Sequence, residues 1–434
     1  MNVVLVSTYD LGRQPFGLAS PAAWLRRAGH EVQAIDLSRG PLSNDPVAAA
    51  DLIAFYLPMH TATRLAMPVI DRVRGINPVA VMCAYGLYAP LNADLLRQHG
   101  IAVVLGPEAE EDLVDLASGV SATPALKTIA RLAFIQPDRA GLPSLDRYAS
   151  LQMPDGSSKI VGATDATRGC KHRCRHCPIV PVYDGQFRAV PVDVVLADIR
   201  AQVEQGATHI SFGDPDFLNG PTHARRIVEA LHRQFPSVTY DAIIKVEHLV
   251  AHRELLPLLS ASGCLFITSA VEAVDDEVLA KLEKGHTRAD FILAAKLCRE
   301  AGLTLVPTFV AFSPWTTIDG YMDLLRIVAD LDLVANVAPV QWGIRLLVTW
   351  ESRLLELPDI RAVIGAFDAN TLTYPWTHRD PRVDLLQQQV MALAGVRAAR
   401  SRDAIFATVC ELAQVNVFLP SRSAIPYINE PWYC

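Results

Sequence analysis

Apolar runs of five or six residues alternate with amphipathic stretches over the first 120 positions of the chain. Each run has the length of a buried strand, and the stretches between the runs have the spacing of helices. The strands predicted from this pattern cover 3–7, 32–36, 52–57, 79–84 and 102–106, and the helices cover 20–29, 62–73 and 91–99. This alternation predicts an α/β domain with a doubly wound parallel sheet, whose ligands lie beyond the carboxyl ends of the strands.

A second series of strands and helices begins near Ile160, after a stretch at 134–148 whose prolines, glycine and aspartates suit a linker. Its predicted strands cover 159–163, 209–213, 239–243, 265–270, 303–312 and 340–348. Repeated βα units over roughly 200 residues predict a full or partial parallel barrel, with its chemistry at the carboxyl ends of the strands.

These patterns divide the chain into four parts. We expect a sheet domain at 1–120, a linker at 121–158, a partial barrel at 159–379 and a mostly helical C-terminal region at 380–434. No strand is expected in the last of these, because the sequence there is first helical and then irregular.

Composition and charge exclude several classes of protein. Hydrophobic residues make up 51% of the chain and charged residues 20%, which suits large cores and excludes disorder. The net charge of −7 argues against non-specific nucleic-acid binding and favours a small-molecule or peptide substrate. There is no apolar run that could span a bilayer and no signal-peptide pattern, so the expected location is the cytoplasm.

Three of the eight cysteines lie within eight residues, in a C-x3-C-x2-C pattern formed by Cys170, Cys174 and Cys177. Clustered cysteines without the regular spacing of a disulfide framework indicate a metal site. Three thiolates would leave one iron of a [4Fe–4S] cluster without a protein ligand, and substrate-activating metal sites need such an open position. A zinc site completed by His172 or His176 is the alternative that these residues leave open.

This spacing after the first strand of a βα barrel resembles the radical S-adenosylmethionine (SAM) superfamily. The resemblance implies that the open iron binds the amino and carboxylate groups of SAM. It also implies that an electron from the cluster cleaves SAM to a 5′-deoxyadenosyl radical, and that a donor such as a flavodoxin or ferredoxin supplies this electron. His176 stands before the third cysteine, where the resemblance implies a residue near the adenine.

The run Gly-Asp-Pro-Asp at the end of the second barrel strand resembles the family's Gly-Gly-Glu segment. In the family, the backbone and the acid of this segment bind the SAM ammonium. The resemblance therefore makes Gly213, Asp214 and Asp216 candidates for SAM binding. A simple strand-ending turn is the alternative, because these are turn-forming residues.

The segment at 267–287 resembles the family's Gly-Ile-Glu-Ser stretch, which is followed by a helix and then by lysine or arginine with Gly-His-Thr. Glu272 matches the glutamate that contacts the SAM ribose or amino group, and Ser269 lies on the same face of the strand. Arg345 is a further candidate, because an arginine inside an apolar strand could bind a carboxylate of SAM or substrate. A structural ion pair is the alternative for Arg345.

The N-terminal sheet domain resembles the cobalamin-binding module that precedes the radical domain in one subgroup of the superfamily. The resemblance rests on the segments at 59–90 and 105–119, while the Asp-x-His-x-x-Gly motif that supplies a cobalt ligand in other classes is absent. The contacts that it implies are Tyr9, Leu11 and Met59 below the cobalt, and Gly86 and Tyr88 along the nucleotide tail. A sheet domain that has lost the cofactor is the alternative.

The last residues, INEPWYC, resemble the tail of a subfamily in which Cys-Cys or Cys-selenocysteine precedes Ala-Glu-Pro. This resemblance implies that Cys434 is a catalytic redox or substrate-binding thiol, and that the chain stops where a selenocysteine codon was read as stop. An ordinary terminus that ends in cysteine is the alternative.

Together these segments predict a radical SAM enzyme with a [4Fe–4S] cluster, SAM and cobalamin as cofactors. Two chemistries fit: cobalamin-dependent methylation of an unactivated carbon, and a radical rearrangement or group transfer without cobalamin. The rival from another class is a zinc-stabilised binding protein without catalysis.

Overall fold

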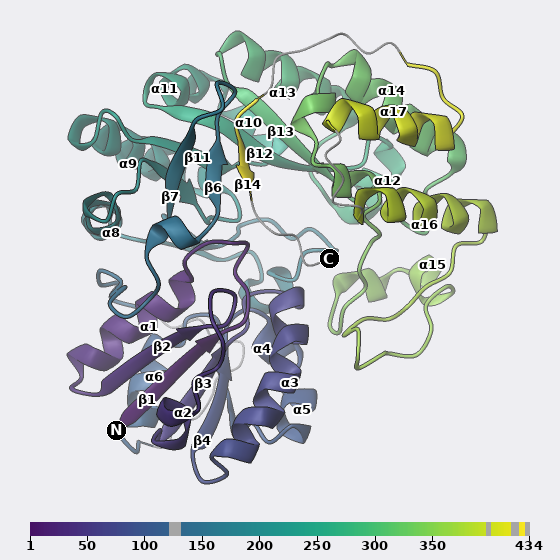
Figure 1. Cartoon of the computed structure of the whole chain (residues 1–434). Coiled ribbons are helices and arrows are strands. Elements are labelled where there is room, and N and C mark those ends of the chain that lie inside the picture. The colour runs from purple at the N-terminus through teal and green to yellow at the C-terminus, as the bar shows by residue number, and fades with distance from the viewer. Residues whose placement is uncertain (121–131, 396–400, 418–424, 430–434) are drawn as a thin grey trace.

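The computed structural model describes residues 1–120, 132–395, 401–417 and 425–429. Two α/β bodies are stacked on each other, with the N-terminal body below the larger one in Figure 1. The α/β fold class predicted from the sequence is confirmed. Among the described residues, no helix has both the length and the apolar character needed to cross a membrane.

The N-terminal body is built on a parallel sheet with the strand order β2-β1-β3-β4-β5. Its strands are β1 (Asn2–Ser7), β2 (Glu31–Asp36), β3 (Leu52–Tyr56), β4 (Val81–Tyr85) and β5 (Val103–Val104). Helices α1 (Phe16–Arg27) and α6 (Glu110–Ala117) cover one face, and α3 (His60–Ile76) and α5 (Ala93–Gln98) the other.

Both faces of this sheet are buried along β1, β3 and β4, which explains why these three strands are apolar without alternation. In β1, Val3 and Leu5 pack into the core beneath α1 and α6, while Val4 and Val6 pack into the core beneath α3. The helix predicted at 91–99 is divided into α4 (Tyr88–Leu91) and α5, with Asn92 between them.

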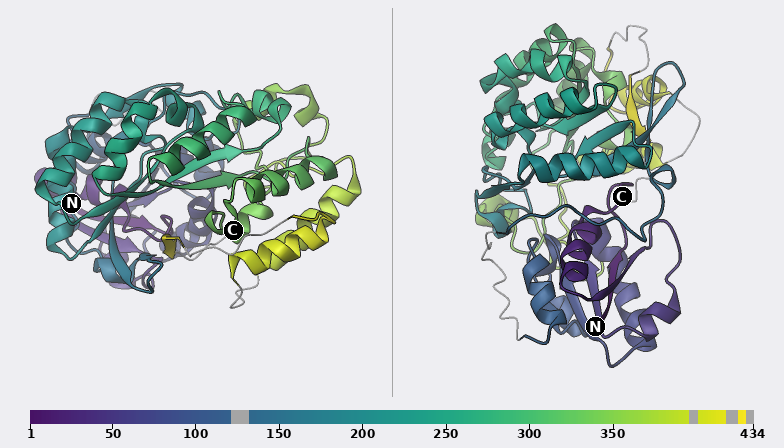
Figure 2. Two further views of the ribbon diagram at one scale, coloured as in Figure 1. Left: turned by 90° about the horizontal axis from the view of Figure 1, so that it is seen from above. Right: turned by 90° about the vertical axis from the view of Figure 1, so that its left-hand side faces the viewer.

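The larger body is a curved seven-stranded sheet in the order β13-β12-β11-β10-β7-β6-β14. Five of its strands are parallel and form the half-barrel: β7 (Ser158–Thr164), β10 (His209–Phe212), β11 (Thr239–Ile243), β12 (Cys264–Glu272) and β13 (Thr304–Phe309). Helices lie along the outside of the curve (Figure 2), among them α8 (Val192–Glu204), α9 (Pro221–Gln234), α13 (Arg288–Glu300) and α14 (Ile318–Asp330). The predicted partial barrel is therefore confirmed.

This body differs from the sequence prediction in one strand. The strand predicted at 340–348 is wrong: residues Pro339–Trp342 form a 3-10 helix, and only Arg345 makes an isolated bridge, to Phe312. Trp342 is buried against Phe309, and its carbonyl accepts a hydrogen bond from the Tyr321 hydroxyl. The apolar side chains of this run are therefore buried by packing in the core and not as part of a strand.

The C-terminal region contains a strand that was not expected. β14 (Tyr427–Asn429) pairs antiparallel with β6 (Ser150–Gln152), which in turn pairs antiparallel with β7. Residues from the end of the chain therefore extend the barrel sheet beside its first parallel strand (Figure 1). The rest of the described C-terminal region is helical, in α16 (Pro381–Gly395) and α17 (Arg402–Leu412).

Candidate functional site at the cysteine loop

The three clustered cysteines lie in a loop at the carboxyl end of β7. A short hairpin of β8 (Thr167–Gly169) and β9 (Phe187–Ala189) holds the two ends of this loop together. Within the loop, the Cys177 amide donates to the Cys174 carbonyl at 3.2 Å, and helix α7 (Val180–Tyr183) follows directly. The loop therefore has a defined backbone that presents the thiols from one short segment.

Gly169 closes the loop just before the first cysteine. Its φ is +75°, and a Cβ atom there would lie 2.4 Å from the Tyr183 ring and 2.6 Å from the Gln186 carbonyl oxygen. Only glycine fits this position, because any side chain would meet both the conformational penalty and the collision.

We expect Gly169→Ala to destabilise the chain and to lower its iron content after reconstitution. Gly141→Ala is the matched control, because Gly141 also has a positive φ (+84°) but no atom within 4 Å of an added Cβ. The control should lose only the conformational term of about 1–2 kcal/mol, and Gly169→Ala should lose clearly more. Chemical denaturation and iron analysis measure both effects, and equal values for the two variants would contradict the steric argument.

The thiols of the loop lie near one another in a largely buried setting. Cys170 and Cys174 are buried and Cys177 is half-buried. Burial and the neighbouring thiols raise the pKa of Cys177 to about 12, although Lys284 acts in the opposite direction. Burial likewise raises the pKa of Cys170. The free thiols of Cys170 and Cys177 therefore stay protonated at neutral pH, and a metal group would bind these two by displacing their protons.

The geometry disfavours the zinc alternative. His176 Nε2 lies 3.1 Å from Glu272 Oε1, and His172 Nε2 lies 3.4 Å from Asp216 Oδ2, so both imidazoles face carboxylates. Within the described part of the chain, no three thiol or imidazole atoms of this loop lie within 4.8 Å of one another. Ligands of one tetrahedral zinc ion would lie within roughly 4 Å of each other. Among the described residues, the thiol and imidazole atoms of the loop are therefore not gathered at the spacing of one zinc ion.

Glu272 connects the cysteine loop to the barrel. It ends β12 with a φ of +67°, at a point where the pairing with β13 shifts register. Its Oε1 lies 3.1 Å from His176 Nε2 and accepts from Lys284 Nζ at 3.3 Å. Burial raises the pKa of this carboxyl, but Lys284 and His176 outweigh it and hold the pKa at about 2. Glu272 is therefore a buried carboxylate that joins the loop to the segment after α12 (Asp276–Leu282).

Several buried polar atoms near Glu272 lack a hydrogen-bond partner. They are Ser269 Oγ on the same strand, His176 Nδ1 on the loop and His286 Nδ1 after α12. An unsatisfied buried polar group costs about 1–3 kcal/mol, so such atoms gather where a bound group completes them. This cluster fits a polar ligand held between the cysteine loop and the end of β12.

The Gly-Asp-Pro-Asp run has a different role for its first acid than the resemblance implies. Asp214 is fully buried, and its carboxylate accepts from the Ala166 amide at 2.9 Å and from the Thr167 hydroxyl at 2.5 Å. A Cβ on Gly213 would lie 2.3 Å from the Asp165 carboxylate. Asp214 therefore fixes the turn between β7 and β8.

Asp216 is also turned into the protein. Its Oδ1 accepts from the Leu218 amide at 3.3 Å, and its Oδ2 faces the imidazoles of His172 and His248. Burial raises the pKa of this carboxyl, but the two imidazoles outweigh it and bring the pKa to about 2. No free carboxylate remains in this run to meet a SAM ammonium.

Residues 165–322 match the family model described as the Radical SAM superfamily. The chain contains a radical SAM domain. The matched residues include the β8–β9 hairpin, the three cysteines, Glu272 and most of the half-barrel. Members of this family use a [4Fe–4S] cluster and SAM, which agrees with the cysteine spacing.

Comparison with characterised proteins extends the similarity beyond the radical SAM domain. The chain is 23% identical over 327 residues to a hopanoid C-3 methylase of Methylococcus capsulatus, covering 70% of this chain and 62% of that protein. It is 20% identical over 271 residues to a tRNA-2-methylthio-N(6)-dimethylallyladenosine synthase of Vibrio vulnificus, covering 59% and 54%. The chain thus spans between half and two thirds of the length of these relatives.

Solved structures resemble the whole fold. The cobalamin-dependent radical SAM enzyme OxsB, with aqua-cobalamin bound, superposes with a TM-score of 0.69 at 15% identity, covering 95% of this chain and 71% of that one. The radical SAM methyltransferase TsrM from Kitasatospora setae, with cobalamin and a [4Fe–4S] cluster bound, gives 0.60 at 17% identity, covering 76% and 70%. At these identities the similarity establishes the fold alone.

The side chain of Arg345 is bound within the protein. Its guanidinium lies 2.6 Å from the Asp384 carboxylate and stacks 3.4 Å from the centroid of the Trp376 ring. It also donates to the Trp376 carbonyl. The structure therefore shows the ion pair considered as the alternative, and this pair fastens α16 to the segment after the barrel.

A cavity of about 190 Å³ lies between the N-terminal sheet and the radical SAM domain. It borders the carboxyl ends of β3 and β4 at Tyr56 and Tyr85, and it faces β8 on the other side. Of the predicted cobalamin contacts, Gly86 lines it, while Tyr9 and Tyr88 are buried in the N-terminal body. Met59 precedes α3 and packs against the core there.

A buried ion pair fixes the two bodies at this cavity. Arg168 in β8 lies 2.7 Å from Glu110 at the start of α6, and it also donates to the Ser20 hydroxyl of α1. Because Arg168 is two residues from Cys170, this pair places the N-terminal sheet directly beside the cysteine loop.

One predicted site residue lies outside the described structure, and two residues of the site were not predicted. Cys434 lies outside the described residues, so its predicted role stays a prediction. Lys284 and His248 were missed as site residues. Lys284 stands at the lysine or arginine position of the motif that ends in Gly-His-Thr, which was a signal in the sequence, whereas His248 meets Asp216 only through the return of the chain after β11.

Proposed function

We propose that this radical SAM domain holds a [4Fe–4S] cluster on Cys170, Cys174 and Cys177 and cleaves SAM reductively. The observation that supports this most is the cysteine loop itself, closed by Gly169, with its thiols largely buried and near one another. Such a cluster, when bound, supplies the electron for cleavage of SAM and an iron that is free to chelate it.

The residues around the loop would orient SAM. The unsatisfied Ser269 Oγ and His176 Nδ1 are available to a polar ligand, and the Glu272–Lys284 pair holds His176 in place. In the Gly-Asp-Pro-Asp run, only the backbone remains available, because both carboxylates are bound within the protein. We therefore assign the recognition of SAM to the end of β12 rather than to the end of β10.

The half-barrel encloses a further cavity of about 210 Å³, which we propose as the substrate chamber. Inward-facing side chains of the parallel strands line it, among them Asp241, Thr268 and Thr308. Residues of β14 and Leu11 of the N-terminal body close it, which would exclude water from a reactive intermediate. A cavity of this size with mostly apolar walls suits a small substrate or one side chain of a peptide.

Anaerobic reconstitution tests this proposal. We expect about four irons per chain, an absorbance typical of iron–sulfur charge transfer, and formation of 5′-deoxyadenosine and methionine when SAM and a reductant are added. A protein that takes up only zinc and shows no such absorbance would contradict the proposal.

We propose cobalamin as a second cofactor, bound at the cavity between the two bodies. Its position at the carboxyl ends of β3 and β4, across from the cysteine loop, is where a doubly wound sheet binds its ligand. OxsB and TsrM, which share the fold, have cobalamin bound. Methylation of an unactivated carbon would follow from such an arrangement, with radical rearrangement or group transfer as the alternative without cobalamin.

The fit of cobalamin is incomplete in one respect. The cavity of about 190 Å³ is smaller than the roughly 300 Å³ of ordinary ligand pockets, and the Tyr56 ring packs against Gly17 at its wall. Binding would require Tyr56 and its neighbours to move, so we derive no reaction step through this cofactor. The absorbance of protein purified without oxygen and supplied with cobalamin measures binding, and a spectrum without a bound corrinoid would remove this part of the proposal.

A further inference from the structure

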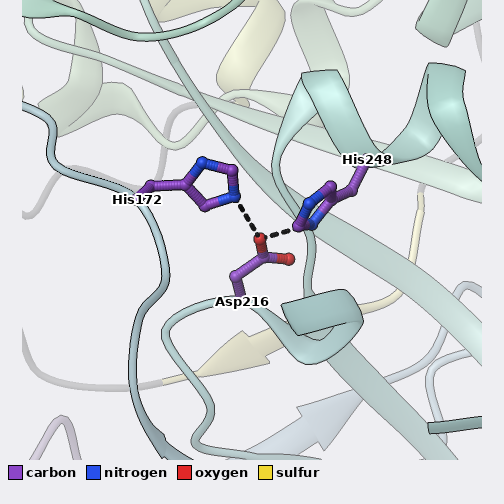
Figure 3. A group of neighbouring side chains, drawn as sticks. All are labelled: His172, Asp216 and His248. Carbon is purple, nitrogen blue, oxygen red and sulfur yellow. Dashed lines mark ion pairs between the residues drawn. The ribbon is translucent and has the colours of Figure 1, made fainter. Parts of the chain in front are cut away.

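Three side chains without a role in the proposed function converge beside the cysteine loop (Figure 3). His172 comes from the loop, Asp216 precedes the 3-10 helix Phe217–Asn219, and His248 lies on α10 (Val246–Ala251). Among the described residues, they are the only three or more His, Cys, Asp or Glu whose ligand atoms all lie within 4.8 Å of one another.

The facing atoms have the spacing of ligands on one ion. Asp216 Oδ2 lies 2.6 Å from His248 Nδ1 and 3.4 Å from His172 Nε2. All three atoms are buried, yet none of them makes a hydrogen bond of adequate geometry. Nitrogen and oxygen ligands bound at about 2.0–2.2 Å to a zinc ion lie about 3 Å apart. The contacts are therefore short enough for shared coordination but misdirected for hydrogen bonding.

Outer contacts orient two of the three ligands. The other carboxylate oxygen of Asp216 accepts from the backbone amides of Leu218 at 3.3 Å and Lys245 at 3.4 Å, which turns Oδ2 toward the imidazoles. The far nitrogen of His172 lies 3.4 Å from Glu247 Oε2. A carboxylate on the far nitrogen of an imidazole is the usual outer partner of a histidine that binds metal.

The negative charge of the Asp216 carboxylate also favours the binding of a cation. Asp216 is fully buried, and a buried carboxylate is costly without a compensating charge. Lys245, whose backbone amide donates to Asp216, has its ammonium 3.2 Å from Glu247 and pairs with that residue. His172 keeps 13% of its side chain exposed, which gives an ion a way in.

We propose that His172, Asp216 and His248 bind one divalent first-row transition-metal ion, separate from the group held by the cysteines. Two imidazole nitrogens and one carboxylate oxygen suit Zn²⁺, Fe²⁺ or Co²⁺, and three protein ligands leave coordination positions open. The ion would lie beside the cysteine loop, because His172 stands between Cys170 and Cys174 in the sequence. Its open positions would take an oxygen or nitrogen atom of a substrate.

The experiment measures binding of Co²⁺ and Zn²⁺ to the full chain after anaerobic reconstitution and dialysis. We expect about one added ion per chain beyond the cluster iron, with the weak visible absorption of Co²⁺ bound by nitrogen and oxygen. His248→Ala and Asp216→Asn should each weaken this binding by at least about tenfold and leave iron and sulfide unchanged. His252→Ala is the matched control, because its ring lies 5.5 Å from that of His248 but outside the group, and it should bind as wild type does.

Three results would overturn the inference: no ion retained beyond the iron, equal binding by His248→Ala and wild type, or loss of iron together with cobalt in His248→Ala. The last would assign these residues to the cluster. If Asp216→Asn does not fold, His248→Gln serves with a thermal readout: Zn²⁺ should raise the Tm of wild type and not that of the variant. The test is independent of the proposed function, since a chain that holds no cluster could still bind Co²⁺ here.

Discussion

Cys174→Ala should abolish both the iron–sulfur cluster and SAM cleavage. Cys174 is the middle cysteine of the loop, where it is buried and lies near Cys170 and Lys284. Because two thiolates cannot hold a [4Fe–4S] cluster at a site built for three, iron content should fall from about four per chain to a small fraction of that. 5′-Deoxyadenosine formation should fall by at least about 10³-fold, since in the proposed function the cluster supplies the electron.

Cys298→Ala is the matched control for this experiment. Cys298 is fully buried in α13, so both substitutions remove a buried thiol, but Cys298 lies in the hydrophobic core and away from the loop. The control should lose some stability through the small cavity and keep its iron and its activity. Iron and sulfide analysis, the visible spectrum and product chromatography measure these effects. A Cys174→Ala protein that retains full iron and turns over SAM would exclude this cysteine as a ligand.

The cysteine site and both sheets could be predicted because their signals are local. The C-x3-C-x2-C spacing lies within one loop, and strands β1, β3 and β4 of the N-terminal sheet carry continuous apolar runs because both faces of the sheet are covered there. The strand predicted at 340–348 was wrong because its local signal is not specific to strands. A short apolar run is equally compatible with irregular packing, and Trp342 fills the core without joining a ladder.

Contacts between distant segments could not be predicted from the sequence. Asp216 and Asp214 have the same residue type and lie two positions apart, yet one faces two imidazoles and the other fixes a turn. Which carboxylate does which depends on the direction of the chain after β10. The same holds for β14, a three-residue strand that pairs with β6 across more than half of the sequence.

The buried pair of Glu272 and Lys284 should give the largest single effects on stability. Their side chains are 10% and 4% exposed, and Lys284 Nζ lies 3.3 Å from Glu272 Oε1. Removing one partner of a buried pair leaves an uncompensated charge and costs about 3–5 kcal/mol. Glu272→Gln should show this cost in full, because Lys284 then has no carboxylate at that distance. Lys284→Met should cost somewhat less, since the His176 imidazole still lies 3.1 Å from Glu272 Oε1.

The double variant Glu272→Gln/Lys284→Met should be less destabilised than the sum of the two single variants, because no isolated charge remains. Chemical denaturation at neutral pH measures the cycle, and Glu229→Gln, in the exposed pair with Arg225, should cost less than about 1 kcal/mol.

The pH dependence of the stability that Glu272 contributes has a definite sign. The pKa of Glu272 lies near 2 in the folded chain and below its ordinary value of 4.5, so its contribution is complete above pH 4.5 and is lost as the pH falls toward 2. Glu272→Gln should remove this part of the acid sensitivity. Additive single variants, or an unchanged acid limb in Glu272→Gln, would show that the pair does not act as the buried link between the cysteine loop and the barrel.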